Sequence, residues 1–404
     1  MRVPLASSGL RKSDIDAVIR VLESGNLTMG NEVKKFEGKM SDYLGVKHFV
    51  MVNSGSSANL LMIEALMRPA VTRPRLNPGD SVLVPAIAWP TTIWPLIQLG
   101  LNPLFVDVDP NTLALDLVAA QQLIDTSRIP VKGIFPIHPL GYAIPPSELE
   151  KFTSRNELIL INDVCESLGS WSEGKHAGTT GVASSFSFYF SHHITTMEGG
   201  GVATDDDALA DDLRSMRSHG WSRDRSDVST WNSQVSSNDS KFLFVSTGYN
   251  VRPMEIQAAI GSLQIVEIDN FVNKRREIAR RVCQALSGTQ LSVIGESAFQ
   301  NAESAQTNSW MLIPIQVKGP NVAERKRQIL DKLASLEIET RPVLTGNFLS
   351  QPAIQRITRH AVDPKSFKVA TEITDSAFLV GAHHDLSEEQ ITFLCDSLSE
   401  ASII

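Results

Sequence analysis

Two adjacent histidines, His192 and His193, stand between an alternating aromatic stretch and a run of three glycines, Gly199 to Gly201. The aromatic stretch, Ser185 to Phe190, predicts a β-strand with serines on one face and phenylalanines on the other. Because imidazole has a pKa of about 6.5, a histidine just after a strand can accept and return protons near neutral pH. The glycines allow a tight return of the chain and a close approach of its backbone to a bound group. A single histidine is more often structural than catalytic, so this pair alone does not fix a reaction.

The segment Ser-Gly-Ser-Ser, residues 54–57, lies between a predicted strand and a predicted helix. Backbone amides at the positive end of a helix dipole can hold a phosphate without a cation. This interpretation assigns Gly55, Ser56 and Ser57 to a phosphate, with a further hydroxyl from Ser187 on the aromatic strand. An ordinary helix cap explains the same pattern equally well, and both interpretations stay open at this point.

Two further side chains directly follow predicted strands. Trp89 comes after the strand at Ser81–Pro85, and its planar ring can stack on a flat ligand ring. Asp163 ends the apolar strand at Glu157–Asn162, where a carboxylate can stabilise a protonated group of a ligand. Each has a structural alternative, a core tryptophan in one case and an aspartate that caps the next turn in the other.

Strands and helices alternate through the first half of the chain. Apolar strands that alternate with helices predict an α/β fold with a mostly parallel sheet covered on both faces. Functional residues of such a sheet lie at the carboxyl ends of its strands. The predicted strands are Phe49–Val52, Ser81–Pro85, Pro103–Asp107, Val131–Pro136 and Glu157–Asn162, and the predicted helices include Asn59–Met67, Thr91–Leu99, Leu117–Ile124 and Ser147–Thr153.

A long helical region, Pro253 to Leu286, is expected to break near Asp269, and we place a domain boundary there. Residues 1–268 then form an N-terminal arm and a large domain, and residues 269–404 form a smaller α+β domain. The elements predicted for the small domain are the strands Met311–Val317 and Ile338–Pro342 and the helices Asn321–Leu336 and Ser387–Ser399.

The composition excludes several classes of partner. The net charge of −8 comes without a basic stripe, so nucleic acid and anionic membranes are poor candidates. No apolar run is long enough to span a membrane and the N-terminus has no apolar signal core, which predicts a cytoplasmic protein. The scattered cysteines, Cys165, Cys283 and Cys395, fit a reducing compartment and are too few for a four-thiolate iron–sulfur cluster. We therefore expect no metal.

The stretch that ends in the glycine run resembles the active-site loop of the nucleotide-sugar aminotransferases, fold-type I enzymes that use pyridoxal 5′-phosphate (PLP). Their pattern is roughly S-F-S-F-x-x-x-K-x-x-x-x-x-E-G-G, and it matches here at Ser185–Phe188 and Glu198–Gly200. His192 occupies the position of the family's lysine, which holds the cofactor as a Schiff base. The segment Gly248–Gly261 also matches, and specific motifs carry the resemblance to about Leu286.

The resemblance implies a fold-type I transferase and a role for each matching residue. Asp163 would keep the pyridine nitrogen protonated, and this pyridinium is the electron sink of PLP chemistry. Trp89 would stack on the ring, and Glu166 would lie at its hydroxyl group. Asn250 would reach the phosphate from a partner subunit, which implies a homodimer with shared sites. The implied cofactor-binding residues are Gly55, Ser56, Ser57, Trp89, Asp163, Glu166, Ser187 and Asn250.

Histidine in place of lysine resembles one branch of the family, the 3-dehydratases of nucleotide-linked 4-keto-6-deoxy sugars, and above all the metal-free kind known from colitose synthesis. That kind acts on a GDP-linked sugar and needs no reductase. The resemblance implies non-covalent PLP, which L-glutamate converts to pyridoxamine 5′-phosphate (PMP) while His192 carries the proton. PMP then supports loss of the 3-hydroxyl, giving a 3-deoxy-4-keto sugar and ammonia. His219, Arg341 and Phe348 are candidates to line the substrate pocket.

Two other functions stay open for the sequence alone. The first is a nucleotide-sugar 4-aminotransferase, which the missing lysine disfavours. The second is a catalytically inactive PLP-binding protein, which the retained Asp163, Trp89 and Ser187 disfavour. His193 and His138 are secondary candidates with structural or substrate-lining roles. The nucleotide and the configuration of the sugar cannot be read from the sequence.

Overall fold

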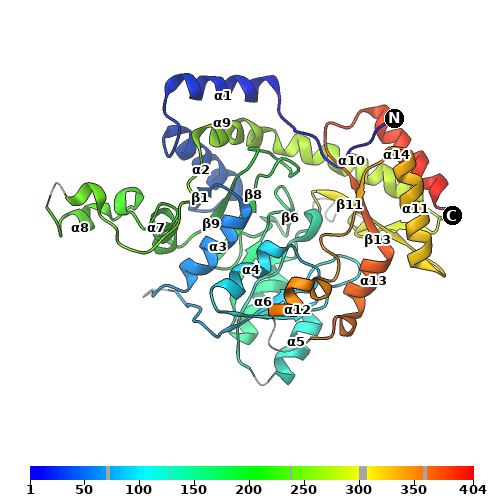
Figure 1. Ribbon diagram of the computed structural model, residues 1–404, viewed down its shortest axis with the longest axis horizontal. Coiled ribbons are helices and arrows are strands. Elements are labelled where there is room, and N and C mark those ends of the chain that lie inside the picture. The colour runs from blue at the N-terminus through cyan, green and yellow to red at the C-terminus, as the bar shows by residue number, and fades with distance from the viewer. Residues whose placement is uncertain (70–72, 128, 237–238, 300–306, 358–361) are drawn as a thin grey trace.

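A mostly parallel sheet forms the centre of the larger part of the molecule (Figure 1). The computed structural model describes residues 1–69, 73–127, 129–236, 239–299, 307–357 and 362–404. In these residues the sheet has the strand order β1-β9-β8-β5-β4-β2-β3, and β9 alone is antiparallel to its neighbours. The predicted α/β class is confirmed. The strands are β1 (His48–Val52), β2 (Ser81–Pro85), β3 (Asn102–Val106), β4 (Val131–Ile134), β5 (Ile159–Asp163), β8 (Ala183–Ser187) and β9 (Gly200–Thr204).

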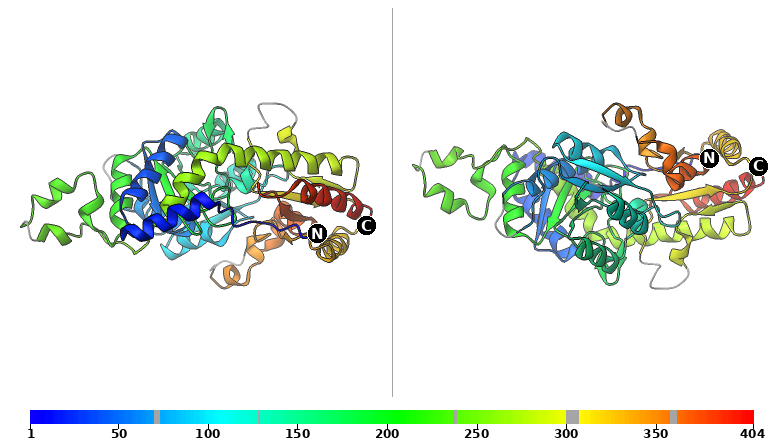
Figure 2. Two further views of the ribbon diagram at one scale, coloured as in Figure 1. Left: turned by 90° about the horizontal axis from the view of Figure 1, so that it is seen from above. Right: turned by 90° about the horizontal axis from the view of Figure 1, so that it is seen from below.

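Apolar residues of the sheet point alternately to its two faces, and helices cover both faces (Figure 2). Val50 and Val52 of β1 pack with α3, α4 and α7, whereas Phe49 and Met51 pack with α2, α9 and α10. Helices α5 and α6 cover the same sheet near β2, β4 and β5. The helices are α1 (Lys12–Ser24), α2 (Asn31–Leu44), α3 (Gly55–Leu66), α4 (Pro90–Gln98), α5 (Leu117–Thr126), α6 (Pro146–Asn156), α7 (Asp207–Met216), α8 (Val228–Asn232), α9 (Glu255–Gln264) and α10 (Ile268–Leu286).

Strand β8 ends at Ser187, three residues earlier than the aromatic alternation predicts. Phe186 and Phe188 are nevertheless both fully buried on the face that α2 covers, as the alternation requires. The chain stays beside β9 for one more residue, because the amide of Phe188 donates to the carbonyl of Gly199 at 2.8 Å. It then turns, and this turn carries the two histidines.

The smaller domain is built on an antiparallel sheet with the order β10-β11-β13-β12. Two of its strands, β10 (Leu291–Val293) and β13 (Ala377–Gly381), were not predicted. The N-terminus also pairs with this domain, since Val3 donates to the carbonyl of Glu337 at 3.0 Å. The boundary at residue 268 stays a prediction. The remaining elements are β11 (Leu312–Val317), β12 (Thr340–Arg341), α11 (Val322–Ser335), α12 (Pro352–Ile357), α13 (Lys368–Ser376) and α14 (Glu388–Ala401), with the small hairpin β6 (Trp171–Ser172) and β7 (Lys175–His176) in the large domain.

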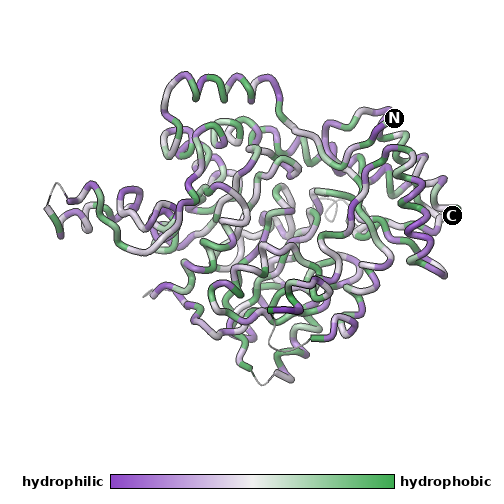
Figure 3. Tube along the Cα trace, in the orientation of Figure 1, coloured by the Kyte–Doolittle hydropathy of each residue, from purple (hydrophilic) through white to green (hydrophobic). Residues whose placement is uncertain are grey.

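The hydropathy of the chain follows this layout. Apolar stretches run through the central strands, and hydrophilic stretches are frequent along the periphery (Figure 3). The segment around α8 projects away from the rest of the molecule (Figure 1). No helix in the described parts of the chain is long and apolar enough to cross a membrane.

Glu255 joins two segments that are far apart in the sequence. Its side chain is 2% exposed and accepts hydrogen bonds from the amides of Gly30, Glu32 and Val33 at 2.8–3.0 Å. These amides belong to the first turn of α2, where a negative charge is favourable because of the helix dipole. Glu255 thereby fixes α2 against α9.

We expect Glu255→Gln to lower the free energy of unfolding by about 1–3 kcal/mol, because a neutral amide oxygen replaces a carboxylate that accepts three backbone bonds. Urea unfolding of the cofactor-free protein measures this. Glu23→Gln, on the exposed face of α1, is the matched control and should change little. Equal stability of both variants would show that the three bonds do not stabilise α2.

Candidate active site

A cavity of about 440 Å³ opens at the carboxyl ends of the parallel strands. Ser54 follows β1, Trp89 follows β2, Asp163 ends β5 and Ser187 ends β8, and all four side chains line this cavity. Arg341 of β12 closes it from the small domain. The sheet thus brings together residues that are more than 130 positions apart in the sequence, as expected for this edge of a parallel sheet.

The serine-rich segment forms the first turn of α3. Ser54 is the N-cap, and its hydroxyl accepts from the amide of Ser57 at 3.1 Å. Gly55 and Ser56 line the cavity, whereas Ser57 is not among the described lining residues. The amides of Gly55 and Ser56 are not used by the cap, so they are available to an anion at the positive end of the helix.

Two glycines allow this turn to lie against the central strands. A Cβ on Gly55 would come within 2.5 Å of the Cβ of Ser187. A Cβ on Gly200 would lie 2.4–2.6 Å from the backbone of Ser54 and Gly55. Gly200 also pairs with Val52 of β1 and with Ser187 of β8. The glycine run therefore fixes the distance between the serine-rich turn, residues 54–57, and the loop that carries His192 and His193. This loop is called the histidine loop.

Asp163 is buried and its carboxylate is held by neutral donors. Oδ2 accepts from Asn59 at 2.9 Å and from Thr92 at 2.8 Å, and Oδ1 accepts from the amide of Cys165 at 3.1 Å. No cation lies within 4.0 Å of this carboxylate among the described residues. The negative charge is thus positioned beside the cavity without a protein counter-ion.

His192 lines the cavity on the side of the histidine loop. Its Nδ1 is buried and has no hydrogen-bond partner among the described residues, and its ring lies 6.0 Å from that of Tyr189 in a T-shaped arrangement. Burial, together with the positive charges of Arg341 and Arg275, lowers the pKa of His192 to about 3. The imidazole is therefore neutral at pH 7, which is the form that can accept a proton.

Glu166 and Arg341 both line the cavity, with Oε1 of Glu166 3.9 Å from Nη2 of Arg341. Glu166 also accepts from the amide of Leu140 at 3.0 Å. Burial raises the pKa of Glu166, while the charge of Arg341 opposes the rise. The pair joins the end of β5 to β12 and so connects the two sheets at the site.

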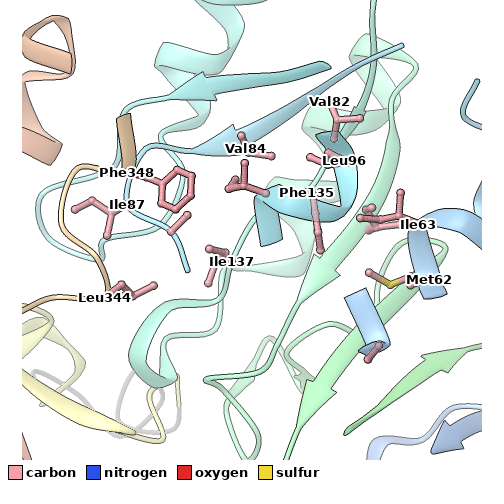
Figure 4. Packing of buried hydrophobic residues seen from close by; sticks show 14 of the residues in the cluster. Met62, Ile63, Val82, Val84, Ile87, Leu96, Phe135, Ile137, Leu344 and Phe348 are labelled. Carbon is pink, nitrogen blue, oxygen red and sulfur yellow. The ribbon is translucent and has the colours of Figure 1, made fainter. Parts of the chain in front are cut away.

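Three of the proposed residues lie in the protein interior, away from the cavity. Phe348 is not in the pocket as expected but in the hydrophobic core (Figure 4). Its ring lies 5.2 Å from that of Trp94. His138 is buried, accepts from the amide of Ile144 and contacts Asn162 at 3.2 Å. His193 is buried and bonded to a serine hydroxyl at 2.8 Å. These contacts are those of structural side chains.

Asn250 and His219 are exposed and do not line the cavity of their own chain in the described residues. They lie next to each other, because Ser218 forms a β-bridge with Asn250 and the amide of His219 donates to the carbonyl of Tyr249. His219 has a left-handed backbone (φ 63°). Within one chain, this pair is separate from the other predicted residues.

Sequence reasoning missed several residues that line or support the cavity. Asn59 and Thr92 hold Asp163, and Tyr189 and Glu198 line the cavity directly. A polar residue inside the apolar helix α3 is the signal that could have identified Asn59. Glu198 was visible only as part of the family pattern. Thr92 and Tyr189 carry no local signal of a role.

These features fit PLP. The free helix amides and the hydroxyl of Ser187 suit a phosphate, and Trp89, which is 50% exposed, offers a ring face at the cavity. The uncompensated carboxylate of Asp163 suits a protonated ring nitrogen. No lysine is among the described residues that line the cavity, so these residues offer no amine for a covalent link.

Comparison with known proteins agrees with this geometry. A model of the DegT/DnrJ/EryC1/StrS aminotransferase family matches residues 9–399. GDP-4-keto-6-deoxy-D-mannose 3-dehydratase from Yersinia pseudotuberculosis is 37% identical over 395 residues, which is 96% of this chain and 95% of that protein.

Two solved structures are similar over nearly the whole chain. A mutant GDP-4-keto-6-deoxymannose-3-dehydratase with bound GDP-perosamine has a TM-score of 0.87 and 34% identity, covering 98% of this chain and 100% of that one. The same type of enzyme with a trapped PLP–glutamate geminal diamine has a TM-score of 0.86 and 34% identity, with the same coverage.

We expect Gly200→Ala to destabilise the protein by about 1–3 kcal/mol, because the new methyl group overlaps the backbone of the serine-rich turn. Gly38→Ala is the matched control. Gly38 lies in α2 with nothing within 4 Å of an added Cβ, so its replacement should stabilise by about 0.5–1 kcal/mol. Urea unfolding without cofactor compares the two, and a stable Gly200→Ala variant would contradict the close contact.

Proposed function

The chain belongs to the DegT/DnrJ/EryC1/StrS aminotransferase family, and we propose on this basis that it is a PLP-dependent 3-dehydratase of a nucleotide-linked 4-keto-6-deoxy sugar. L-Glutamate is the proposed amino donor, and the products are 2-oxoglutarate, ammonia and a 3-deoxy-4-keto sugar. One observation carries the proposal. His192, at the position of the family's lysine, lines the cavity together with Trp89, Asp163 and Ser187.

The cofactor is proposed to bind without a covalent link. When bound, PLP supplies an electron sink and exchanges an amino group with glutamate. The amides of Gly55 and Ser56 and the hydroxyl of Ser187 hold the phosphate. Ser57 orders this turn, because its amide donates to the hydroxyl of the N-cap serine. Trp89 covers one face of the ring. Asp163, oriented by its three hydrogen bonds, keeps the ring nitrogen protonated.

His192 is the proposed proton carrier. Its Nδ1 is buried, which leaves Nε2 as the nitrogen open to the cavity. A neutral Nε2 would take the proton from the α-carbon of glutamate and return it to the cofactor carbon on the other side of the shared nitrogen. Because imidazole has no primary amine, it cannot reclaim the cofactor in the way a lysine does. This difference favours loss of the 3-hydroxyl over retention of an amino sugar.

Arg341 and Glu166 are proposed to serve the substrate and the cofactor. Arg341 carries the only positive charge among the described residues that line the cavity, so an anionic group of the substrate or of glutamate binds there. The nearest atoms of Arg341 and Glu166 are 3.9 Å apart, which is too far for a hydrogen bond. The guanidinium donors of Arg341 therefore remain available to an anion. Glu166 then lies at the ring hydroxyl of the cofactor.

The nucleotide is proposed to be guanosine diphosphate. The relative from Yersinia is named for a GDP-linked sugar, and the mutant structure holds GDP-perosamine. The protein is further proposed to act in the cytoplasm without an iron–sulfur cluster or a reductase, in line with its free cysteines.

A homodimer is proposed to complete each site. Asn250 and His219 are adjacent and exposed, and they lie outside the cavity of their own chain. In a two-fold dimer they can reach the cavity of the other subunit, where Asn250 would contact the phosphate and His219 the substrate.

We expect the purified protein with PLP, L-glutamate and GDP-4-keto-6-deoxymannose to release ammonia and a 3-deoxy sugar. CDP-, UDP- and dTDP-linked 4-keto-6-deoxy sugars are the comparison substrates, and mass spectrometry identifies the products. His192→Asn should retain PLP but convert it to PMP about 100- to 10,000-fold more slowly, because an amide cannot carry the proton.

Each result has a distinct meaning. A 4-amino sugar as product would establish the aminotransferase instead. Failure with every sugar, despite tight PLP binding, would favour the inactive binding protein. Conversion of PLP to PMP by His192→Asn at the wild-type rate would remove His192 from the mechanism.

The shared site predicts that two inactive variants restore each other. In a mixed dimer of Asn250→Ala and His192→Asn chains, one cavity has both wild-type residues, so about half of the wild-type rate per mixed dimer is expected from one intact site of two. Refolding the mixture and measuring turnover tests this, with each variant refolded alone as control. A mixed dimer without activity would place Asn250 in the site of its own chain.

A further inference from the structure

Behind His192 lies a second, much smaller cavity that the proposed reaction does not use. It has space of about 10 Å³ for the centre of a single water molecule. Segments from the N-terminal arm, the histidine loop, α9, α10 and the end of β13 meet around it. The lining residues are Ser7, Gly9, Phe190, Ser191, His192, His193, Thr195, Gln264, Arg275, His383 and His384.

Four of these residues are histidines whose buried Nδ1 has no hydrogen-bond partner in the part of the chain that the structure describes. His383 contacts the carbonyl of Pro4 through Nε2 at 3.2 Å, and the ring of His384 stacks on Phe271 at 3.8 Å. The other two histidines of the cluster, His192 and His193, lie in the histidine loop. A cluster of four imidazoles around one small cavity would be strongly affected by any charge placed among them.

The charge among them is that of Arg275. This guanidinium is 1% exposed, and no carboxylate lies within 4.0 Å of it in the described parts of the chain. Its hydrogen bonds go to backbone carbonyls instead, to Met311 at 2.9 Å, Trp310 at 3.4 Å and His192 at 3.2 Å. Burial lowers the pKa of Arg275 to about 10, so it remains protonated at neutral pH.

We propose that Arg275 is the positioning residue of the site: it fixes the backbone of His192 against the small domain and places a positive charge behind the imidazole. The geometry supports both parts. Helix α10 runs from the large sheet into the small domain (Figure 2), and Arg275 lies on it opposite the histidine loop and the start of β11. Its importance for catalysis rests on the proposed function of His192.

The direction of the electrostatic effect follows from the surroundings. The positive charge of Arg275 adds to burial in lowering the pKa of His192, His193, His383 and His384. The exposed carboxylate of Asp385 acts in the opposite direction on His383 and His384. The titratable and charged groups around the two cavities that His192 joins are Asp163, Cys165, Glu166, Tyr189, His193, Glu198, Arg275, Arg341, His383 and His384.

The proton balance of unfolding tests this directly. The four histidines are neutral in the folded protein and become protonated on unfolding below their ordinary pKa, so stability falls as the pH decreases from 7 to 5. In Arg275→Met the folded histidines bind protons more readily. The variant should therefore take up about one proton fewer than wild type on unfolding near pH 5. Urea unfolding of the cofactor-free protein at several pH values measures this uptake.

Two control variants separate charge from packing. Arg275→Lys keeps the charge and should keep the proton uptake, although it loses hydrogen bonds and stability. Arg276→Met removes the same charge from the next residue, whose Nε donates to the carbonyl of Asn308, and should also leave the uptake unchanged. A less stable Arg275→Met with wild-type uptake would reduce Arg275 to a structural residue and overturn the proposal.

A second measurement needs no variant at residue 275. In wild-type protein with ¹³C-labelled histidine, NMR at pH 5 should show neutral rings at the four clustered positions. Signals are assigned with single His→Gln variants. Protonated rings in the cluster would also overturn the proposal. Neither measurement depends on turnover, so a protein without dehydratase activity would refute the proposed function and leave this test intact.

Discussion

The site depends on the close contact of three backbones at Gly200. This residue pairs with Val52 on one side and Ser187 on the other, and it lies against the turn that begins α3. The antiparallel strand β9 begins here, between β1 and β8, at the end of the otherwise parallel sheet where the cavity opens. Any side chain at Gly200 would push the α3 turn away from the histidine loop. The spacing between the proposed phosphate site and His192 is therefore fixed by backbone packing.

Charged side chains are distributed unevenly around the cavity. Asp163 accepts hydrogen bonds from the neutral donors Asn59 and Thr92, and a cationic ring nitrogen is the partner that its carboxylate lacks among the described residues. On the opposite side, the hydrogen bonds of Arg275 within the described residues go only to backbone carbonyls, and Arg275 keeps a positive charge behind His192. One side of the cavity favours a protonated ring and the other a neutral imidazole. Together they suit a proton acceptor working beside an electron sink.

Regular patterns in the sequence were enough to predict the large sheet, while the small domain and the inner supports of the site were not. Alternating apolar strands placed Trp89, Asp163 and Ser187 at one edge because parallel strands end together. Strand β13 was missed, since a short run of buried residues has no period that distinguishes it from a helix. Phe348, expected at the substrate pocket from the family resemblance, is fully buried beside Trp94, because a resemblance of sequence does not distinguish a core aromatic residue from one that lines a pocket.

The serine-rich turn shows why two interpretations of one motif need not compete. Ser54 caps α3 and binds the amide of Ser57, as an ordinary helix start does. A helix has four unpaired amides at its start, however, and this cap satisfies one of them. Gly55 and Ser56 keep theirs and line the cavity. Capping orders the turn and thereby directs the remaining amides, so the structural role is the physical basis of the proposed phosphate site.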